Sequence, residues 1–289
     1  MKQRVLTAAV LLALLALVVW QIYTPLFIAV IAVFSAIAAG EIMHCAKISN
    51  KFLFVFGVIV AFIVPLFSSA SILEPFVPTY TLLKFYNFLP KAVYVIVIVI
   101  AYFLAMLKDY EHTKFEDVAI TIVASLLVPS GFALFGVLRD TTGYGNQIGV
   151  YLIFYALISA LGTDVGAQLG GMAIGKTKMS PKISPKKTVE GAVCGIVFSL
   201  ILNAVAIVLY NHFADFRLTM TQATVLLAAA PFIAFLSMMG DLTASVLKRN
   251  FDVKDFGKIF PGHGGVMDRF DSSLFTLPLT FVVAQFIVR

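Results

Sequence analysis

Charged side chains are scarce in this sequence. Asp, Glu, Lys and Arg make up 12% of its 289 residues, whereas about 25% is usual in soluble domains. Hydrophobic residues make up 61%, and the mean hydropathy is +0.99. A soluble fold could not bury that much apolar surface. The composition therefore excludes a soluble enzyme and a disordered regulator, and predicts an integral membrane protein.

Cysteine is also rare. The two cysteines, Cys45 and Cys194, lie in or beside apolar stretches. In such surroundings a cysteine behaves as a small hydrophobic residue, which argues against a disulfide scaffold and against a redox pair.

Long apolar runs occupy most of the chain, and a helix needs about 17–25 such residues to cross a bilayer. Because a backbone in lipid must satisfy its own hydrogen bonds, we expect helices. The sequence predicts an all-α, polytopic transmembrane bundle of about nine spans. These spans are 5–22, 24–45, 52–70, 91–107, 118–138, 148–170, 190–210, 223–240 and 272–288.

The first run could also be a signal peptide, because Lys2 and Arg4 precede it. No small-residue cleavage site follows Trp20, which favours an uncleaved helix. Pro25 suits the first turn of the second helix. We expect residues 1–289 to form a single membrane domain, in which 1–138 provides lipid and dimer packing and 139–289 provides the catalytic helices and loops.

The basic residues are distributed unequally. With nine spans, 16 of the 21 Lys and Arg residues fall on one side. The positive-inside rule places that side in the cytoplasm. Topology thus explains the net charge of +6 without a nucleic-acid partner. Polar residues concentrate in two loops of that side, 171–189 and 241–271.

An acidic residue, Asp164, lies inside a predicted span, where an ionisable group is costly and usually faces a cavity or a partner. At 100° per residue, Asp164, Gln168 and Gly171 share one helix face. This pattern predicts a polar stripe, although a hydrogen bond between packed helices would also explain Asp164.

A lysine-rich loop follows that stripe. Lys186, Lys187 and Thr188 stand just before a predicted helix start near residue 190. Ammonium groups beside a helix N-terminus favour phosphate binding. The alternative is that lysines of this loop, Lys176 and Lys178 above all, anchor it to anionic lipid headgroups.

The second polar loop begins with a potential helix extension. If the span ending near Gly240 continues, then Asp241, Ser245, Lys248 and Arg249 lie on one face. This face would carry a carboxylate, a hydroxyl and two cations.

A glycine-rich turn lies further along this loop. His263 stands between Pro261-Gly262 and Gly264-Gly265, which are residue types suited to a tight turn with exposed backbone amides. We expect His263 to serve as a proton donor, a phosphate contact or a constraint on the turn.

The second loop contains four carboxylates: Asp241, Asp255, Asp268 and Asp271. We expect Asp268 and Asp271 to open the last span, one helical turn apart. An oxygen-rich set with one histidine and no nearby cysteine suits Mg²⁺ better than zinc. Basic neighbours of a hard metal suggest a polyphosphate substrate. The alternative is a solvated loop whose charges pair with one another.

Other acidic and histidine positions carry weaker signals. Glu41 and His44 lie one turn apart near the end of a predicted span, and we interpret them as an interfacial pair. The mixed charges of residues 108–117 indicate a solvated loop.

Together these motifs resemble the signature of the phosphatidate cytidylyltransferases, also called CDP-diglyceride synthases. The resemblance lies in Ser245-x-Leu247-Lys248-Arg249, Lys254-Asp255, Gly257 and Pro261-x-His263-Gly264-Gly265-Val266-x-Asp268-Arg269-Phe270-Asp271. The segments around Thr163-Asp164 and 182–191 are also similar. Gln168 and Val189 depart from the family pattern, where aromatic residues are common.

The resemblance implies transfer of CMP from CTP to phosphatidate, with Mg²⁺ and a monovalent cation such as K⁺. It also implies a homodimer in the inner membrane of a cell, with its active site facing the cytoplasm. In that family, residues matching Asp241 and Asp268 are metal ligands. A CTP-dependent enzyme acting on another lipid, such as a polyprenol kinase or an ether-lipid cytidylyltransferase, and a transporter are the alternatives.

The sequence thus predicts three groups of site residues. The catalytic group is Asp268, Asp241, His263 and Arg269. The substrate-binding group is Lys186, Lys187, Ser245, Lys248, Arg249, Lys254, Asp164, Gly264 and Gly265. The metal ligands are Asp241, Asp268, Asp271 and Asp255.

Overall fold

A computed structural model describes residues 16, 18–68, 90–141, 147–214 and 217–287. The first predicted span, 5–22, falls largely outside these residues, so its existence stays a prediction.

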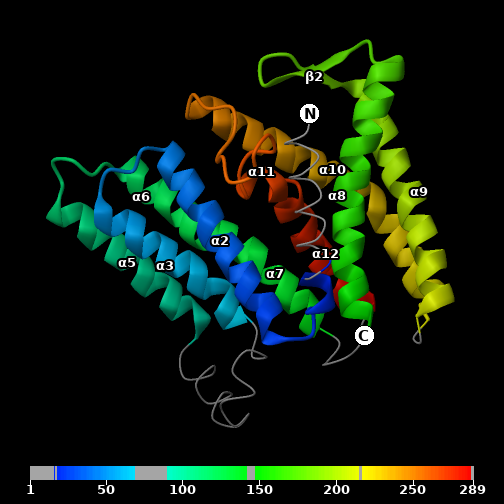
Figure 1. Ribbon diagram of the computed structural model, residues 1–289, viewed down its shortest axis with the longest axis horizontal. Coiled ribbons are helices and arrows are strands. Elements are labelled where there is room, and N and C mark those ends of the chain that lie inside the picture. Colours follow the sequence, from blue (N-terminus) through cyan, green and yellow to red (C-terminus); the bar gives the residue numbers. More distant parts are fainter. Residues whose placement is uncertain (1–15, 17, 69–89, 142–146, 215–216, 288–289) are drawn as a thin grey trace, which may run out of the picture. The chain divides into compact units, whose positions relative to one another are not determined.

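The described chain is almost entirely helical (Figure 1). Its helices are α2 (Pro25–Cys45), α3 (Lys51–Ser68), α5 (Lys91–Lys108), α6 (Phe115–Ile122), the π-helical turn η2 (Val123–Leu127), α7 (Val128–Asp140), α8 (Gln147–Ile174), α9 (Val189–Phe213), α10 (Met220–Asn250), α11 (Met267–Phe270) and α12 (Ser273–Ile287). The two strands are β1 (Lys178–Ser180) and β2 (Ser184–Thr188).

Seven of the described helical segments are long and apolar enough to cross a membrane, with α6, η2 and α7 joined as one segment, Phe115–Asp140. They correspond to the predicted spans from 24–45 to 223–240. The eighth counterpart, α12, is apolar but has 15 residues. The chain is therefore an all-α, multi-pass membrane protein, and the total of nine spans stays a prediction.

Local sequence explains where these helices begin. Pro25 occupies the first turn of α2 after Thr24, as expected, because its missing N–H would have no partner there. Asn50 Oδ1 accepts hydrogen bonds from the N–H groups of Phe52 (3.0 Å) and Leu53 (3.3 Å) at the start of α3. Such caps satisfy the amides that lack a helical partner.

The chain divides into two compact units. The first comprises residues 1–137 and 255–268, and the second comprises 138–254 and 269–289. The glycine-rich turn thus packs with the N-terminal helices, although it follows α10 in sequence.

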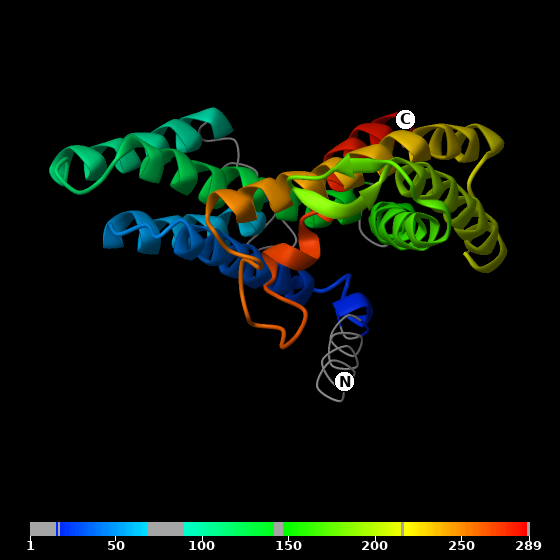
Figure 2. The same cartoon turned by 90° about the horizontal axis from the view of Figure 1, so that it is seen from above.

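In the first unit, α2 and α3 lie side by side in both views, with the η2 turn packed against both (Figures 1 and 2). Close approach occurs at Gly57, where an added Cβ would meet Met43 and Thr121 side chains at 3.1–3.3 Å. Tyr102 is fully buried, and its hydroxyl shares a 2.7 Å hydrogen bond with Ser125.

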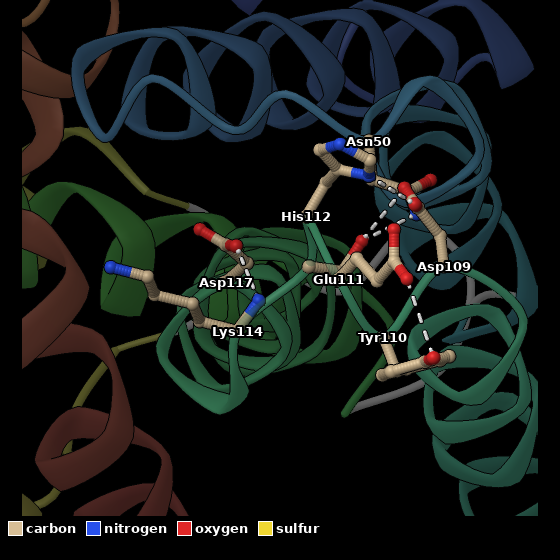
Figure 3. A network of polar contacts seen from close by, with 8 residues as sticks. Asn50, Asp109, Tyr110, Glu111, His112, Lys114 and Asp117 are labelled. Atoms are coloured by element: carbon tan, nitrogen blue, oxygen red, sulfur yellow. Dashed lines mark hydrogen bonds and ion pairs between the residues drawn. The ribbon is translucent and has the colours of Figure 1, made fainter.

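A polar network joins the loop before α3 to the loop after α5 (Figure 3). Asn50 Nδ2 donates to Thr113 Oγ1 (2.8 Å), while Asp109 Oδ1 lies 2.9 Å from His112 Nδ1. The predicted solvated loop is confirmed, since most of residues 108–117 are exposed, while Thr113 is buried, with an exposed fraction of 3%. This network holds two helix ends together.

In the second unit, α8 and α9 pack along their length (Figures 1 and 2). Small residues allow this approach, since a Cβ added at Gly166 or Gly170 would overlap Phe198 or Cys194. Buried polar groups add hydrogen bonds between the helices: Asn203 Nδ2 donates to Ser159 Oγ (2.9 Å).

Candidate functional site

A β-hairpin connects α8 to α9, where we expected a lysine-rich loop without strands in an all-α chain. β1 and β2 are antiparallel, with Lys178 opposite Thr188 and Ser180 opposite Ser184. Residues 181–183 form the turn, between Ser180 at the end of β1 and Ser184 at the start of β2. Figure 1 shows the hairpin at one end of α8 and α9.

The hairpin is fixed to the first turn of α9. Thr188 is the last residue of β2 and the N-cap of α9, and its Oγ1 accepts a 3.2 Å hydrogen bond from the Gly191 N–H. The Glu190 carboxylate accepts hydrogen bonds from Lys176 N–H (3.0 Å) and Thr177 N–H (3.1 Å). The predicted helix start near residue 190 is confirmed, and both ends of the hairpin are anchored to it.

A cavity of about 560 Å³ lies within the second unit, between the hairpin and the helices. Its polar lining comes from three elements: Asp164, Gln168 and Gly171 of α8, Lys186 and Lys187 of β2, and Asp241 of α10. The predicted polar stripe on α8 is confirmed, since all three of its members line the cavity. The cavity thus brings residues of the stripe and of the lysine-rich loop together with Asp241, the first residue of the second polar loop.

An ion pair bridges this cavity. Lys187 Nζ lies 2.5 Å from Asp241 Oδ2, and the two side chains are 25% and 29% exposed. Asp164 lies within electrostatic range of Asp241, Lys187, Asp271 and Arg269. The cavity lining therefore carries two carboxylates and two ammonium groups, and a phosphate can bind there by taking the place of Asp241 beside Lys187.

The predicted span ended at Gly240, whereas α10 continues to Asn250, so the condition under which the polar residues share one face is met. Asp241 and Ser245 are on the same face, where Ser245 Oγ donates a long, 3.5 Å hydrogen bond to Asp241 Oδ1. Lys248 is half-buried and Arg249 is exposed. Of these four residues, Asp241 alone lines the cavity described above.

The glycine-rich turn is confirmed in the first unit. Gly262 and Gly264 have φ values of 76° and 84°, in the left-handed region that favours glycine. Phe260 and Gly264 form an antiparallel bridge, and His263 N–H donates to Phe260 O at 2.8 Å. His263 Nδ1 is buried with no hydrogen-bond partner among the described residues. The roles predicted for His263, as a proton donor, a phosphate contact or a constraint on the turn, stay predictions.

Asp268 organises this turn. Its carboxylate is 8% exposed, and Oδ2 accepts hydrogen bonds from Phe256 N–H (2.8 Å) and Gly265 N–H (3.0 Å). The Gly265 amide, which we expected to face the substrate, is therefore directed at Asp268. Substrate contacts by Gly264 and Gly265 stay predictions.

Our interpretation of Glu41 as an interfacial partner of His44 is wrong. His44 is exposed, whereas Glu41 is 8% exposed and accepts hydrogen bonds from Val266 N–H (3.0 Å) and Met267 N–H (2.9 Å). One signal could have revealed this, because an acidic residue within a predicted span requires donors.

The last helices also differ from expectation. We expected Asp268 and Asp271 to lie one turn apart on one helix that opens the last span. Instead α11 ends at Phe270, Asp271 Oδ1 accepts the Ser272 N–H (2.7 Å), and α12 begins at Ser273. A carboxylate that binds the following amide interrupts the helix here.

The predicted set of four metal ligands is divided between the units. Asp255 and Asp268 belong to the first, and Asp241 and Asp271 belong to the second. Within the ranges that the structure describes, no three His, Cys, Asp or Glu side chains are grouped in a way that could hold a metal ion. Mg²⁺, however, is commonly held by one or two carboxylates together with substrate phosphates. Asp241, at the border of a cavity that also contains lysines, fits that mode of binding.

Sequence comparisons find relatives. The model of the Cytidylyltransferase family matches residues 2–287. The chain is 53% identical over 62 residues to a phosphatidate cytidylyltransferase of Bacillus subtilis, covering 21% of this chain and 23% of that protein. It is 42% identical over 81 residues to one of Staphylococcus haemolyticus, covering 28% and 30%, and 46% identical over 68 residues to one of Staphylococcus aureus, covering 24% and 25%. The matched segments thus span less than a third of these relatives.

Proposed function

Because the chain belongs to the Cytidylyltransferase family, we propose that it transfers CMP from CTP to phosphatidate, giving CDP-diacylglycerol and pyrophosphate. The single observation that carries this proposal is the cavity in which Lys186 and Lys187 meet Asp164 and Asp241. The relatives are named phosphatidate cytidylyltransferase, which supports phosphatidate over polyprenol or an ether lipid as the acceptor.

In the proposed reaction, a phosphate oxygen of phosphatidate attacks the α-phosphorus of CTP. The bond from that phosphorus to the β-phosphate oxygen breaks, and pyrophosphate leaves. A phosphate monoester is already largely ionised at pH 7, because its second pKa is about 6. No strong general base is needed, so the aspartates are better suited to binding a cation.

The main barrier is the repulsion between two anionic substrates. Lys186 and Lys187 place ammonium groups at the cavity, next to the positive end of the α9 dipole. The first amides of α9 are already used, since Val189 N–H donates to Thr177 O and Gly191 N–H to Thr188 Oγ1. We therefore infer that the lysines, rather than helix amides, contact the phosphates.

Substrate binding would rearrange the ion pair. A phosphate bound at Lys187 would release Asp241 Oδ2 from the ion pair, and Asp241 would then be free to serve as one of the residues that hold Mg²⁺. We propose that Asp241 and Asp268 hold Mg²⁺, with Asp255 and Asp271 as further ligands and a monovalent cation such as K⁺ as a second cofactor. Mg²⁺ supplies charge neutralisation of the phosphates and of the departing pyrophosphate. We propose catalytic roles for His263 and Arg269, and substrate binding by Ser245, Lys248, Arg249 and Lys254.

The membrane setting follows from the lipid acceptor. The acyl chains of phosphatidate can stay in the bilayer while its phosphate reaches the end of the bundle. Under the predicted topology, the hairpin and its lysines lie on the side that holds 16 of the 21 basic residues. By the positive-inside rule this supports an inner-membrane protein whose active site faces the cytoplasm. We propose a homodimer as the assembled form.

The direct test mixes the purified protein in detergent with CTP, Mg²⁺ and phosphatidate, and follows pyrophosphate and CDP-lipid together. We expect both products in equal amounts, and neither when diacylglycerol replaces phosphatidate or when EDTA is added. Phosphorylated lipid without pyrophosphate would instead indicate a kinase.

A further inference from the structure

We propose that Glu41 is a positioning residue that holds the 255–268 segment in its active conformation. This inference rests on the proposed function, because the segment contains the predicted site residues His263 and Asp268. Glu41 belongs to α2, more than 200 residues away in sequence.

The contact is bidentate. Glu41 Oε1 accepts the Val266 N–H at 3.0 Å, and Oε2 accepts the Met267 N–H at 2.9 Å. Because these amides open α11, they have no partner within that helix. A buried carboxylate and two buried amides thus satisfy one another, and removing either group would leave the other without a partner.

The segment is shaped to receive this carboxylate. A Cβ added at Gly257 or Gly265 would overlap the Glu41 carboxyl group. Only glycine at positions 257 and 265 leaves room for the Glu41 carboxyl group. One turn further along α2, Cys45 Sγ donates to Phe256 O at 3.2 Å. Two side chains of α2 thus hold both ends of the glycine-rich segment.

Glu41 and Asp268 bind neighbouring amides of the same turn. Asp268 binds the amides of Phe256 and Gly265, and Glu41 binds the next two amides, those of Val266 and Met267. Three consecutive amides, at residues 265–267, are therefore fixed by two carboxylates. The orientation of the Asp268 carboxylate depends on this arrangement, and small displacements of a reacting group can lower a rate about 100-fold.

The test compares Glu41→Gln with a matched control. Glutamine keeps the size of the side chain, but it turns an NH₂ group toward one of the two amide donors. Ser35→Ala is the control, because Ser35 is a buried α2 residue whose Oγ donates to Ala61 O (2.8 Å), away from the 255–268 segment. Gly257→Ala perturbs the contact from the other side and leaves Glu41 intact.

Two measurements are made on each full-length variant in detergent: hydrogen exchange of the peptides covering 255–270, and kcat and KM for CTP and phosphatidate. For Glu41→Gln and Gly257→Ala, we expect exchange of these peptides to be about tenfold faster or more. We expect kcat to fall about 10- to 100-fold, with KM changing less. Ser35→Ala should leave both quantities as in the wild type.

Unchanged exchange in Glu41→Gln overturns the structural contact. Faster exchange with normal kcat overturns the positioning role and leaves Glu41 as a purely structural anchor. If wild-type protein forms no CDP-lipid, the proposed function fails, and the proposal that Glu41 serves this reaction fails with it. The exchange data would still decide whether Glu41 holds the segment, so the two failures are distinguishable. Should Glu41→Gln not fold, Gly257→Ala decides by the same criteria.

Discussion

Replacing Lys187 by alanine tests the cavity most directly. Lys187 lines the cavity and lies 2.5 Å from Asp241 Oδ2. The substitution removes one ammonium group from the proposed phosphate site and leaves the hairpin backbone unchanged. We therefore expect a large effect on catalysis and a small effect on stability.

The magnitudes follow from exposure and charge. A hydrogen bond to a charged group contributes about 1.5–3 kcal/mol, which corresponds to a decrease of about 10- to 150-fold in kcat/KM for CTP. The ion pair itself retains partial exposure, 25% for Lys187 and 29% for Asp241. Solvent-accessible pairs contribute about 1 kcal/mol or less, so the free energy of unfolding should fall by no more than that.

The assay measures initial rates of pyrophosphate release against CTP concentration, together with thermal unfolding in detergent. Lys182→Ala is the matched control, because Lys182 is an exposed residue of the same hairpin turn and lies outside the cavity lining. Its kcat/KM should change less than about twofold. If Lys187→Ala were as active as the wild type, or if Lys182→Ala were equally impaired, the cavity would not be the phosphate site.

Three further substitutions probe other parts of the site. Asp268→Asn should abolish CDP-lipid formation while the protein remains folded by gel filtration, because the asparagine oxygen can still accept the Phe256 and Gly265 N–H groups but the charge is lost. Normal turnover would rule out a metal-ligand role. Lys248→Ala should raise KM for CTP with little change in helicity by circular dichroism, and unchanged KM and kcat would remove Lys248 from the site. Thr188→Ala should lower the free energy of unfolding by about 1 kcal/mol through loss of the α9 N-cap, whereas Thr188→Ser should retain stability; equal melting temperatures for the two would contradict the cap.

Hydropathy located the spans well, because the bilayer imposes a length on each helix. The run predicted at 91–107 is helix Lys91–Lys108, and that at 24–45 is Pro25–Cys45. Hydropathy did not locate the end of a helix that extends beyond its apolar residues. The run predicted at 223–240 belongs to helix Met220–Asn250. Hydropathy reports which residues suit lipid, whereas the helical hydrogen bonds continue past the last apolar residue. The sequence only allowed a helical extension there, on which Asp241, Ser245 and Lys248 would share one face.

The hairpin was missed because its strands are very short and polar. β1 has three residues and β2 has five, too few for an alternating apolar pattern. Its stability comes from contacts outside the strands, above all the Glu190 carboxylate with the Lys176 and Thr177 amides. Such contacts depend on the first turn of α9, and no local pattern reports them.

Glu41 and Asp164 show how such contacts could be anticipated. Each is an acidic residue inside a predicted span, so each must find hydrogen-bond donors or cations within the protein. Asp164 lies within electrostatic range of Lys187 and Arg269, and both of these cations belong to motifs that the sequence analysis identified. Glu41 accepts hydrogen bonds from two backbone amides. Every residue except proline has such an amide, so the sequence indicates an available donor only where a turn requires glycine. An acid in a span and a distant glycine-rich turn are therefore complementary signals. Pairing them predicts a contact between α2 and the 255–268 segment from the sequence alone.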